Sequence, residues 1–269
     1  MKISRIILTI VVGFLVVGTI IGLIVNNDLH DQTIRGAETN LIFAKNYISY
    51  VIEDETMAFN LFAIQPADSP HKITNDTITS LDIENENIEV LDFSVESGIS
   101  HKGYTLVNFI VDISVKGSEV EKADELAISW NEQSVEYLKI GEMILKNKEV
   151  TDVGGFSPVE AYTVGYPSPS LDIHIQNDYH ETVLLEGVRD LNHNLTYSFD
   201  SPIEFLPNGS NNVVIAKFHI KNEYDFYTIS PIANYTLGND SKDSHLPGVI
   251  FRMLDSDEDK IERMIKNIN

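Results

Sequence analysis

Residues 106–115 read LVNFIVDISV, and this stretch decides the fold. Every odd-numbered position from Val107 to Val115 is apolar, whereas polar side chains such as Asn108 and Asp112 stand between them. Successive side chains of a β-strand point to opposite faces, so this two-residue period is typical of a strand with one buried face. The sequence therefore predicts a half-buried strand of an antiparallel sheet.

The same period recurs on both sides of this strand. Before it, Leu91, Phe93 and Val95 are expected to share one face, and after it residues 171–176 alternate in the same way. Further apolar runs follow at residues 183–188, 196–199, 203–206, 213–221 and 224–229. Short strands separated by turn residues predict a mainly β fold, an immunoglobulin-like antiparallel β-sandwich.

Two segments fit more than one kind of element. Residues 41–52 have apolar side chains at helix-like spacing, so they fit a short helix or a strand, followed by a strand over residues 57–63. Residues 121–138 also fit either a helix or a strand, and residues 140–146 fit another strand.

A short helix is expected at the C-terminal end. Ser256 would cap it, and the acidic residues that follow complement the positive end of a helix. Its apolar stripe consists of Ile261, Met264, Ile265 and Ile268. We expect this stripe to dock on the second half of the chain, the alternative being a free interaction helix.

A cluster of glycines and prolines between Gly154 and Pro169 predicts a linker at residues 154–170. On this interpretation residues 41–153 form a first β-rich module. Residues 171–269 form a second β-sandwich module that includes the C-terminal helix. One continuous sandwich is the alternative, because no internal repeat supports a duplication.

Residues 6–25 are uncharged and mostly apolar, and the leader before them, residues 1–5, carries Lys2 and Arg5. A helix of this length matches the roughly 30 Å hydrocarbon core of a bilayer. We therefore expect a single-pass anchor, a cytoplasmic N-terminus, a stalk at residues 26–40 and an extracytoplasmic body. The lipid bilayer is thus an expected partner.

The length of the apolar run favours an uncleaved anchor over a signal peptide, as does the lack of an Ala-x-Ala-like site after it. Within it, Gly18 and Gly22 have the Gly-x-x-x-Gly spacing at which two membrane helices approach closely. They are candidate contacts of a transmembrane dimer. Because glycine is frequent in membrane helices, this spacing alone does not determine the oligomeric state.

The chain is strongly acidic, with 41 Asp and Glu against 19 Lys and Arg and a net charge of −22. Such a charge repels phosphate backbones, so nucleic acid is excluded as a partner, whereas cations, basic proteins and neutral glycans are not. Without any Cys, the chain has no disulfide framework and no thiol nucleophile. With its many Ile and Asn residues, we expect a Gram-positive bacterial source.

Catalytic motifs are absent from the sequence. It has no Gly-x-Ser-x-Gly, Ser-x-x-Lys, Gly-x-x-x-x-Gly-Lys or His-Glu-x-x-His motif. A binding role is therefore favoured over an enzymatic one, and no cofactor is expected. A hydrolase that uses two carboxylates is the alternative, since the distance between two such groups cannot be read from a sequence.

Two groups of residues are weak candidates for metal binding. Asp172 and His174 alternate along one strand face, and Asp178 and His180 follow them. A solvated strand face and a polar turn explain these four residues equally well.

Asp255, Asp257 and Asp259 resemble the start of a calcium loop in their spacing. The turn glycine is missing, however, and Lys266 stands where the closing glutamate would be. Helix capping explains these carboxylates as well.

Trp130, the single tryptophan, is a candidate sugar-stacking platform, although a core position is the more common use of so large a side chain.

These observations favour a membrane-anchored, extracytoplasmic β-sandwich protein that acts as a binding or accessory module at the cell surface. The expected partner class is a membrane or cell-wall protein. The alternatives are an anchored hydrolase of an extracellular polymer and a structural stalk or calcium-stabilised adhesin.

Overall fold

The computed structural model describes residues 40–52, 56–130, 134–148, 155–159 and 164–268. The expected leader, anchor and stalk up to residue 39 lie outside these ranges, as do Gly18 and Gly22. In the described part, no helix is long and apolar enough to cross a membrane.

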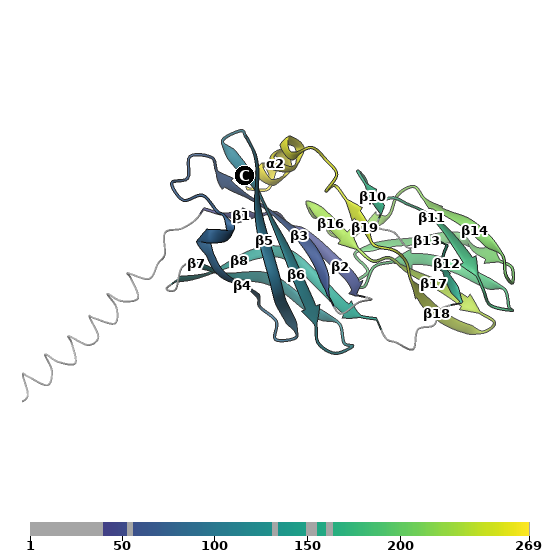
Figure 1. Ribbon diagram of the computed structural model, residues 1–269. Coiled ribbons are helices and arrows are strands. Elements are labelled where there is room, and N and C mark those ends of the chain that lie inside the picture. Colours follow the sequence, from purple (N-terminus) through teal and green to yellow (C-terminus); the bar gives the residue numbers. More distant parts are fainter. Residues whose placement is uncertain (1–39, 53–55, 131–133, 149–154, 160–163, 269) are drawn as a thin grey trace, which may run out of the picture.

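The described chain is almost entirely β-structure (Figure 1). A four-stranded sheet has the order β1 (Ile42–Phe43), β3 (Met57–Pro66), β6 (Tyr104–Val115) and β5 (Ile88–His101). A seven-stranded sheet has the order β10 (Val164–Tyr166), β19 (Val249–Phe251), β16 (Phe226–Ile229), β2 (Asn46–Ile52), β8 (Ser134–Asn147), β7 (Glu121–Trp130) and β4 (Ile78–Ile83).

The second half of the chain forms two further sheets. One has the order β14 (Ser210–Ile215), β11 (Leu171–Asn177) and β9 (Phe156–Pro158). The other has the order β15 (His219–Ile220), β13 (Leu195–Phe205), β12 (Val183–Arg189), β17 (Ile232–Leu237) and β18 (Asp240–His245). A 3₁₀ turn, η1 (Asn75–Thr77), and a C-terminal helix, α2 (Asp257–Lys266), complete the described elements.

The stretch that decides the fold is a strand, as predicted. β6 lies between β3 and β5, and its odd-numbered side chains from Val107 to Val115 are buried. The two ambiguous segments are strands too, because residues 46–52 form β2 and residues 121–130 form β7. The expected position of Leu91 is wrong, because an irregularity between Val90 and Asp92 shifts the register and leaves Leu91 exposed.

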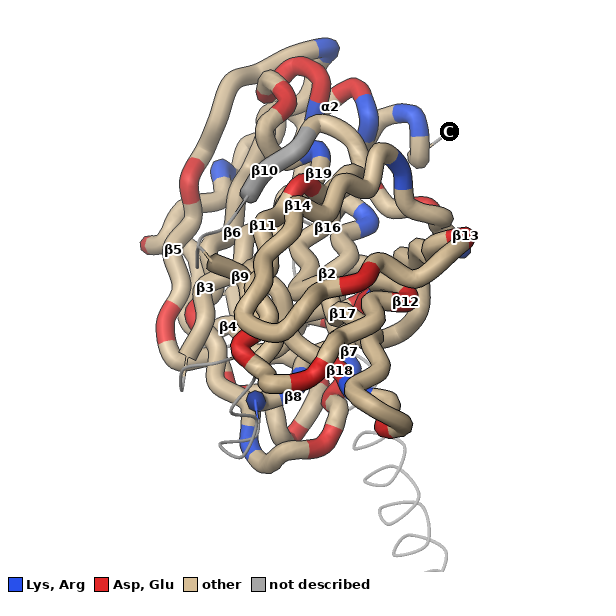
Figure 2. Tube along the Cα trace, turned by 90° about the vertical axis from the view of Figure 1, so that its right-hand side faces the viewer, with Lys and Arg blue, Asp and Glu red and all other residues tan. Residues whose placement is uncertain are grey.

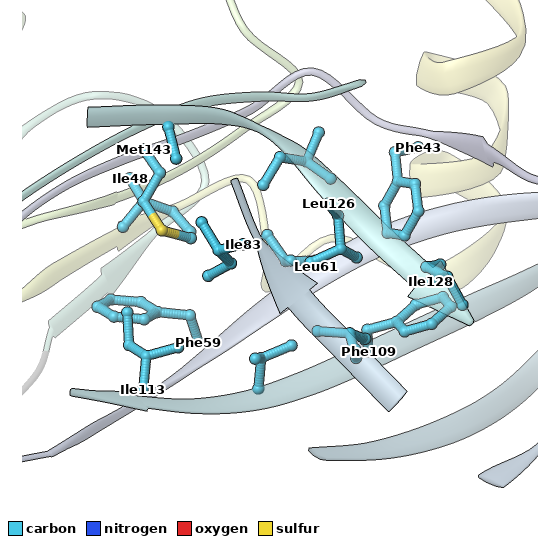
Figure 3. Packing of buried hydrophobic residues seen from close by; sticks show 14 of the residues in the cluster. Phe43, Ile48, Phe59, Leu61, Ile83, Phe109, Ile113, Leu126, Ile128 and Met143 are labelled. Atoms are coloured by element: carbon cyan, nitrogen blue, oxygen red, sulfur yellow. The ribbon is translucent and has the colours of Figure 1, made fainter. Parts of the chain in front are cut away.

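The first core lies between the four-stranded sheet and one half of the seven-stranded sheet. Phe59 and Phe109 from β3 and β6 face Ile48, Leu126 and Met143 from β2, β7 and β8 (Figure 3). The two layers therefore bury the inward faces of a sandwich that is formed by residues before the expected linker.

The second core is formed mainly by residues after the expected linker. The linker prediction is wrong for part of residues 154–170, because β9 and β10 are strands of the sheets and Phe156 is buried in this core. Phe156, Phe205 and Tyr235 bring their rings together within it, with centroids 4.9 Å apart for the first pair and 4.8 Å for Phe156 and Tyr235. Tyr47 and Ile144, from β2 and β8, also enter this core.

The seven-stranded sheet is shared by both cores. It was expected to be antiparallel, but it is mixed. β2 pairs in parallel with β8 on one side and with β16 on the other, so strands from both halves of the chain join in one sheet. Alternate side chains of β2 serve the two cores, Ile48 the first and Tyr47 the second. The halves thus have separate cores but share the seven-stranded sheet, whereas each of the other three sheets belongs to one half.

Gly141 is the residue at which β8 joins β2. It has a φ of +106°, and a Cβ at this position would lie 2.0 Å from the backbone oxygen of Asn46. An L-residue side chain therefore fits neither the backbone conformation nor the space between the strands.

The C-terminal helix forms as predicted, with Ser256 at its N-cap accepting a hydrogen bond from the backbone N–H of Asp259. Its docking site is only in part the expected one, because Phe226 of the second half joins a cluster that is formed mainly by the first half. Ile261 and Met264 pack on the outer face of β3 and β6, against Phe62, Ile64, Leu106 and Ala44. The reason is that residues 61–64 of β3 are all apolar, so that strand must be covered on both faces.

An ion-pair cluster holds the helix to the turn between β5 and β6. Glu262 accepts from Lys102 Nζ at 2.8 Å and contacts His101 Nε2 at 3.0 Å. These two neighbours lower the pKa of Glu262 to about 2, Lys102 being the stronger cause.

We expect Gly141→Ala to destabilise the fold by about 3 kcal/mol or more, because backbone strain and a clash with β2 add together. Gly103 is a matched control, since it has a φ of +83° but nothing within 4 Å of its would-be Cβ. Gly103→Ala should cost about 1–2 kcal/mol. Chemical unfolding of the full chain in detergent measures both, and equal losses would refute the close approach of β8 to β2.

Glu262→Gln should reduce the loss of stability in acid. A depressed folded-state pKa stabilises the protein above the unfolded value of 4.5, and this contribution is lost as the pH falls from 4.5 toward 2. Thermal unfolding at pH 6 and pH 3 should show a smaller decrease in Tm for the variant than for the wild-type protein. An identical decrease would contradict the ion-pair cluster.

Candidate functional site

The first group of candidate metal ligands does not form a cluster. Asp172, His174, Asp178 and His180 are all exposed, the first two on the outer face of β11. Asp172 accepts from Asn212 Nδ2 at 2.7 Å, and Asp178 accepts from Gln176 Nε2 at 2.6 Å.

The second group is distributed among separate partners around α2. Asp255 pairs with Arg263, Asp257 pairs with Lys260 at 3.0 Å, and the Asp259 carboxylate accepts from the Ser256 hydroxyl at 2.7 Å. Within the described ranges, no three His, Asp or Glu side chains come together as a group that could hold a metal.

Trp130 is a partly buried edge residue of the first core. Its indole N–H donates to Glu136 at 2.9 Å. Its ring packs against the first core, which favours a packing role over a sugar platform.

A buried polar network joins the two halves of the chain. Asp190, at the end of β12, is 0% exposed, and its carboxylate accepts from the Tyr47 hydroxyl and from the backbone N–H groups of Asn194 (2.8 Å) and Leu195 (3.3 Å). Burial is the main cause that raises the pKa of both Asp190 and Tyr47. The site is closed to solvent, so we assign it to structure.

The turn after Asp190 makes two further contacts with the first half of the chain. The backbone N–H of Leu191 donates to Ser49 Oγ at 3.1 Å, and Asn192 Nδ2 donates to Glu142 at 3.0 Å. Tyr224 donates to the same Glu142 carboxylate. This turn therefore fixes the second core against β2 and β8.

The outer face of β4, β7 and β8 is the best candidate for a binding surface. Antiparallel register aligns its side chains in three rows across the strands. We call it the Tyr137 face, and its rows are Ser80–Ser129–Val135, Asp82–Ala127–Tyr137 and Glu84–Glu125–Lys139. The hydroxyls of Ser80 and Ser129, 2.9 Å apart, and the ion pair of Lys139 with Glu125, at 2.8 Å, confirm the alignment.

Two large apolar side chains of this face are exposed to water. Tyr137 is 61% exposed and Val135 is 54% exposed, and they stand two residues apart on β8. Their neighbours across the strand pair, Ala127 and Ser129, are small. The result is a flat surface with a projecting aromatic ring.

The row Glu84–Glu125–Lys139 is rich in carboxylates. The Glu84 and Glu125 carboxyl groups interact with each other, and this interaction is the main cause that raises the pKa of Glu84 and lowers the pKa of Glu125. Lys139 contacts Glu125 and Asp124, each at 2.8 Å, and these hydrogen bonds raise its pKa to about 12. The negative charge of Glu84, Asp124 and Glu125 therefore exceeds the single positive charge of Lys139.

Acidic residues are spread over much of the described surface, whereas several Lys and Arg lie near α2 (Figure 2). The Tyr137 face lies on the opposite side of the first core from α2, because the helix packs on β3 and β6.

The sequence indicated some of these residues but not their grouping. The sequence left residues 121–138 open between a helix and a strand, and the pairing of β7 with β4 depends on contacts some fifty residues apart, such as Ser80 with Ser129. Asp190 and Tyr47 gave no local signal at all.

Comparison with protein-family models and with curated proteins finds no match. Among solved structures, a protein of unknown function from Porphyromonas gingivalis W83 is 12% identical, with a TM-score of 0.23 over 79% of this chain and 97% of that chain. The D0-D1 domain of intimin is 10% identical, with a TM-score of 0.20 over 79% and 97%.

The C-terminal domain of the Streptococcus pyogenes antigen I/II-family protein AspA is 9% identical, with a TM-score of 0.22 over 80% of this chain and 99% of that chain. At these identities and TM-scores, the likenesses carry no argument about function.

Asp190→Ala should destabilise the protein by about 3–5 kcal/mol, because it leaves the buried Tyr47 hydroxyl and two backbone N–H groups without an acceptor. Asp190→Asn retains one acceptor oxygen and should cost less. Asp172→Ala, at an exposed carboxylate, is the control and should change stability by no more than about 0.5 kcal/mol. Urea unfolding compares the three, and equal effects of the two alanine variants would argue against the network.

Proposed function

We propose that the chain is a membrane-anchored, extracytoplasmic binding module that presents the Tyr137 face to a protein partner in the cell envelope. The apolar run at residues 6–25, with basic residues before it, supports the anchor and its orientation. The two sandwich-like cores support an immunoglobulin-like module that displays a surface rather than enclosing a substrate.

The observation that carries this proposal is the exposure of Tyr137 beside Val135 on a flat sheet face. Large aromatic side chains are enriched at the centres of protein interfaces, where covering them excludes water. Two adjacent apolar side chains that project from a sheet surface are therefore better explained by a partner than by the stability of the isolated chain.

A hydrolase is supported less well. Glu84 and Glu125 lie side by side on neighbouring strands of an open sheet face, whereas retaining and inverting glycosidases hold their carboxyl groups about 5–9.5 Å apart on either side of the substrate. A calcium-stabilised adhesin is also supported less well, since Asp255, Asp257 and Asp259 have separate partners within the protein.

Protease treatment of intact cells that express the full chain tests the location. We expect peptides from beyond residue 40 to be released from intact cells. Their release from broken cells only would contradict the extracytoplasmic location.

A photo-crosslinking amino acid at position 137 tests the binding face in the same cells. We expect one discrete adduct at position 137, and none at position 206, because Leu206 is equally exposed but lies on the other core. Equal adducts at both positions, or none at either, would contradict a specific role of the Tyr137 face.

A further inference from the structure

We infer that the Tyr137 face binds a basic protein by holding one of its arginine side chains over Ala127, between Tyr137 and Asp82. The inference rests on the proposed function and names the chemistry that the partner presents. On this view the partner lies across β4, β7 and β8, on the open face of the sheet.

The middle row of the face has a larger side chain at each end and a small one between them. Tyr137 of β8 stands opposite Ala127 of β7, which in turn stands opposite Asp82 of β4. Neighbouring strands lie about 4.8 Å apart, so the backbones of Tyr137 and Asp82 are about 10 Å apart. Ala127 is only half-buried, so solvent reaches this part of the sheet. We call the surface over Ala127, between Tyr137 and Asp82, the Ala127 seat.

The two ends of the Ala127 seat suit a planar organic cation. Tyr137 is 61% exposed, and Asp82 is exposed and has no ion-pair partner within the described ranges. A guanidinium group packs favourably on the face of a tyrosine ring, and its N–H donors can pair with a carboxylate at the same time. An arginine side chain over Ala127 would therefore have an aromatic ring on one side and an acid on the other.

The neighbouring row adds negative charge beside the seat. Glu84 and Glu125 lie about 7 Å from the middle row along the strands. Lys139 pairs with Glu125 and with Asp124, each at 2.8 Å. Together with Asp82, four carboxylates thus stand against one ammonium group. A basic protein is attracted by this charge, whereas nucleic acid, an anionic lipid and a second copy of this chain, with its net charge of −22, are repelled.

The carboxylates are arranged for an organic cation rather than for a metal ion. Calcium and magnesium need several oxygen ligands within about 2.6 Å. Asp82 and Glu84 belong to different rows of the face, and no three acidic or histidine side chains in the described part of the chain form a metal-binding group. A guanidinium group has five N–H donors in a planar fork, so it can serve carboxylates that lie apart.

The remaining row indicates a protein rather than a small free cation. Val135 is 54% exposed, and it shares this row with the hydroxyl groups of Ser80 and Ser129. Covering Val135 requires an apolar group about 7 Å from the arginine. A protein surface that carries an apolar side chain beside an arginine meets both requirements.

A neutral glycan is the competing occupant, since a sugar ring can stack on Tyr137. Such binding needs no positive charge on the ligand and depends little on salt. Arginine binding needs the charge, the acidic groups and free access to Ala127. These requirements separate the two occupants by experiment.

The test uses the full-length chain in nanodiscs of zwitterionic lipid and four probes. The first is a nine-residue peptide of three Gly-Arg-Val repeats. The second has citrulline in place of arginine, which keeps the shape of the side chain and removes its charge, and the third has Lys in place of Arg. The fourth probe is a chitin hexasaccharide. Calorimetry measures each affinity at 50 and 500 mM salt.

We expect the Arg peptide to bind, and the citrulline peptide to bind at least tenfold more weakly, because only the first carries charge. The Lys peptide should bind about threefold more weakly than the Arg peptide, because an ammonium group packs less well on an aromatic ring and cannot form a planar fork. The Kd of the Arg peptide should increase at least fivefold between 50 and 500 mM salt.

Variants assign the binding to the Ala127 seat. Ala127→Leu fills the seat and should increase the Kd of the Arg peptide about tenfold, whereas a purely apolar contact would become stronger. Tyr137→Ser and Asp82→Asn should each increase this Kd by about fivefold to tenfold. Tyr137→Phe keeps the aromatic ring and should leave the Kd within twofold.

Matched controls lie on the second core. Leu206→Ser and Glu204→Gln are changes at exposed residues away from the Tyr137 face, and they should leave the Kd of the Arg peptide within twofold. Circular dichroism verifies that every variant is folded.

The inference is overturned if the Arg peptide does not bind, if the citrulline or the Lys peptide binds equally well, or if Ala127→Leu leaves the Kd unchanged or lowers it. If the hexasaccharide binds instead and depends on Tyr137, the binding role of the face stands and the cationic partner is wrong. Failure of the surface location in the protease experiment is a separate result.

Discussion

The position of β2 between two parallel neighbours is the constraint on which the rest of the structure depends. β8 reaches β2 because Gly141 has no side chain at the point of contact, and β16 reaches it from the far half of the chain. Because alternate side chains of a strand face opposite ways, one strand can supply both cores. β2 therefore fixes the two halves in one sheet, and the cores cannot move as independent modules without breaking its hydrogen bonds.

Two further contacts secure this arrangement from either side. Where the two halves meet, the buried Asp190 carboxylate accepts a hydrogen bond from the Tyr47 hydroxyl. Breaking a hydrogen bond between buried groups is costly in free energy. Around the C-terminus, α2 returns from the second half of the chain to cover β3 and β6 of the first. A binding module fixed in this way presents its surface with little loss of conformational entropy when a partner binds.

The alignment of the strands places part of the acidic charge of the chain at one position on the surface. Dispersed carboxylates mainly keep a protein soluble, but the register of β4, β7 and β8 concentrates several of them beside Tyr137. An aromatic group surrounded by charge of one sign combines affinity from burial with selectivity from electrostatics. The first group of metal candidates, on and after β11, lacks this convergence, since Asp172 and Asp178 bond to separate amide side chains and no three possible ligands come together within the described ranges.

The sequence by itself determined the elements whose burial pattern is local. The alternation from Val107 to Val115 fixes β6 because a strand with one buried face has a two-residue period, and Ser256 with its acidic neighbours fixes the start of α2. It also determined the charge of the surface. Residues 46–52 gave no clear pattern because both faces of β2 are buried, so neither period appears.

The tertiary structure alone decided the partners of these elements: the parallel pairing of β2, the docking of α2 on the first core, the contact of Tyr47 with Asp190 and the three rows of the Tyr137 face. Each joins residues that are far apart in the chain. Such pairings depend on the total free energy of closing many segments together, and no local pattern of residues contains that sum.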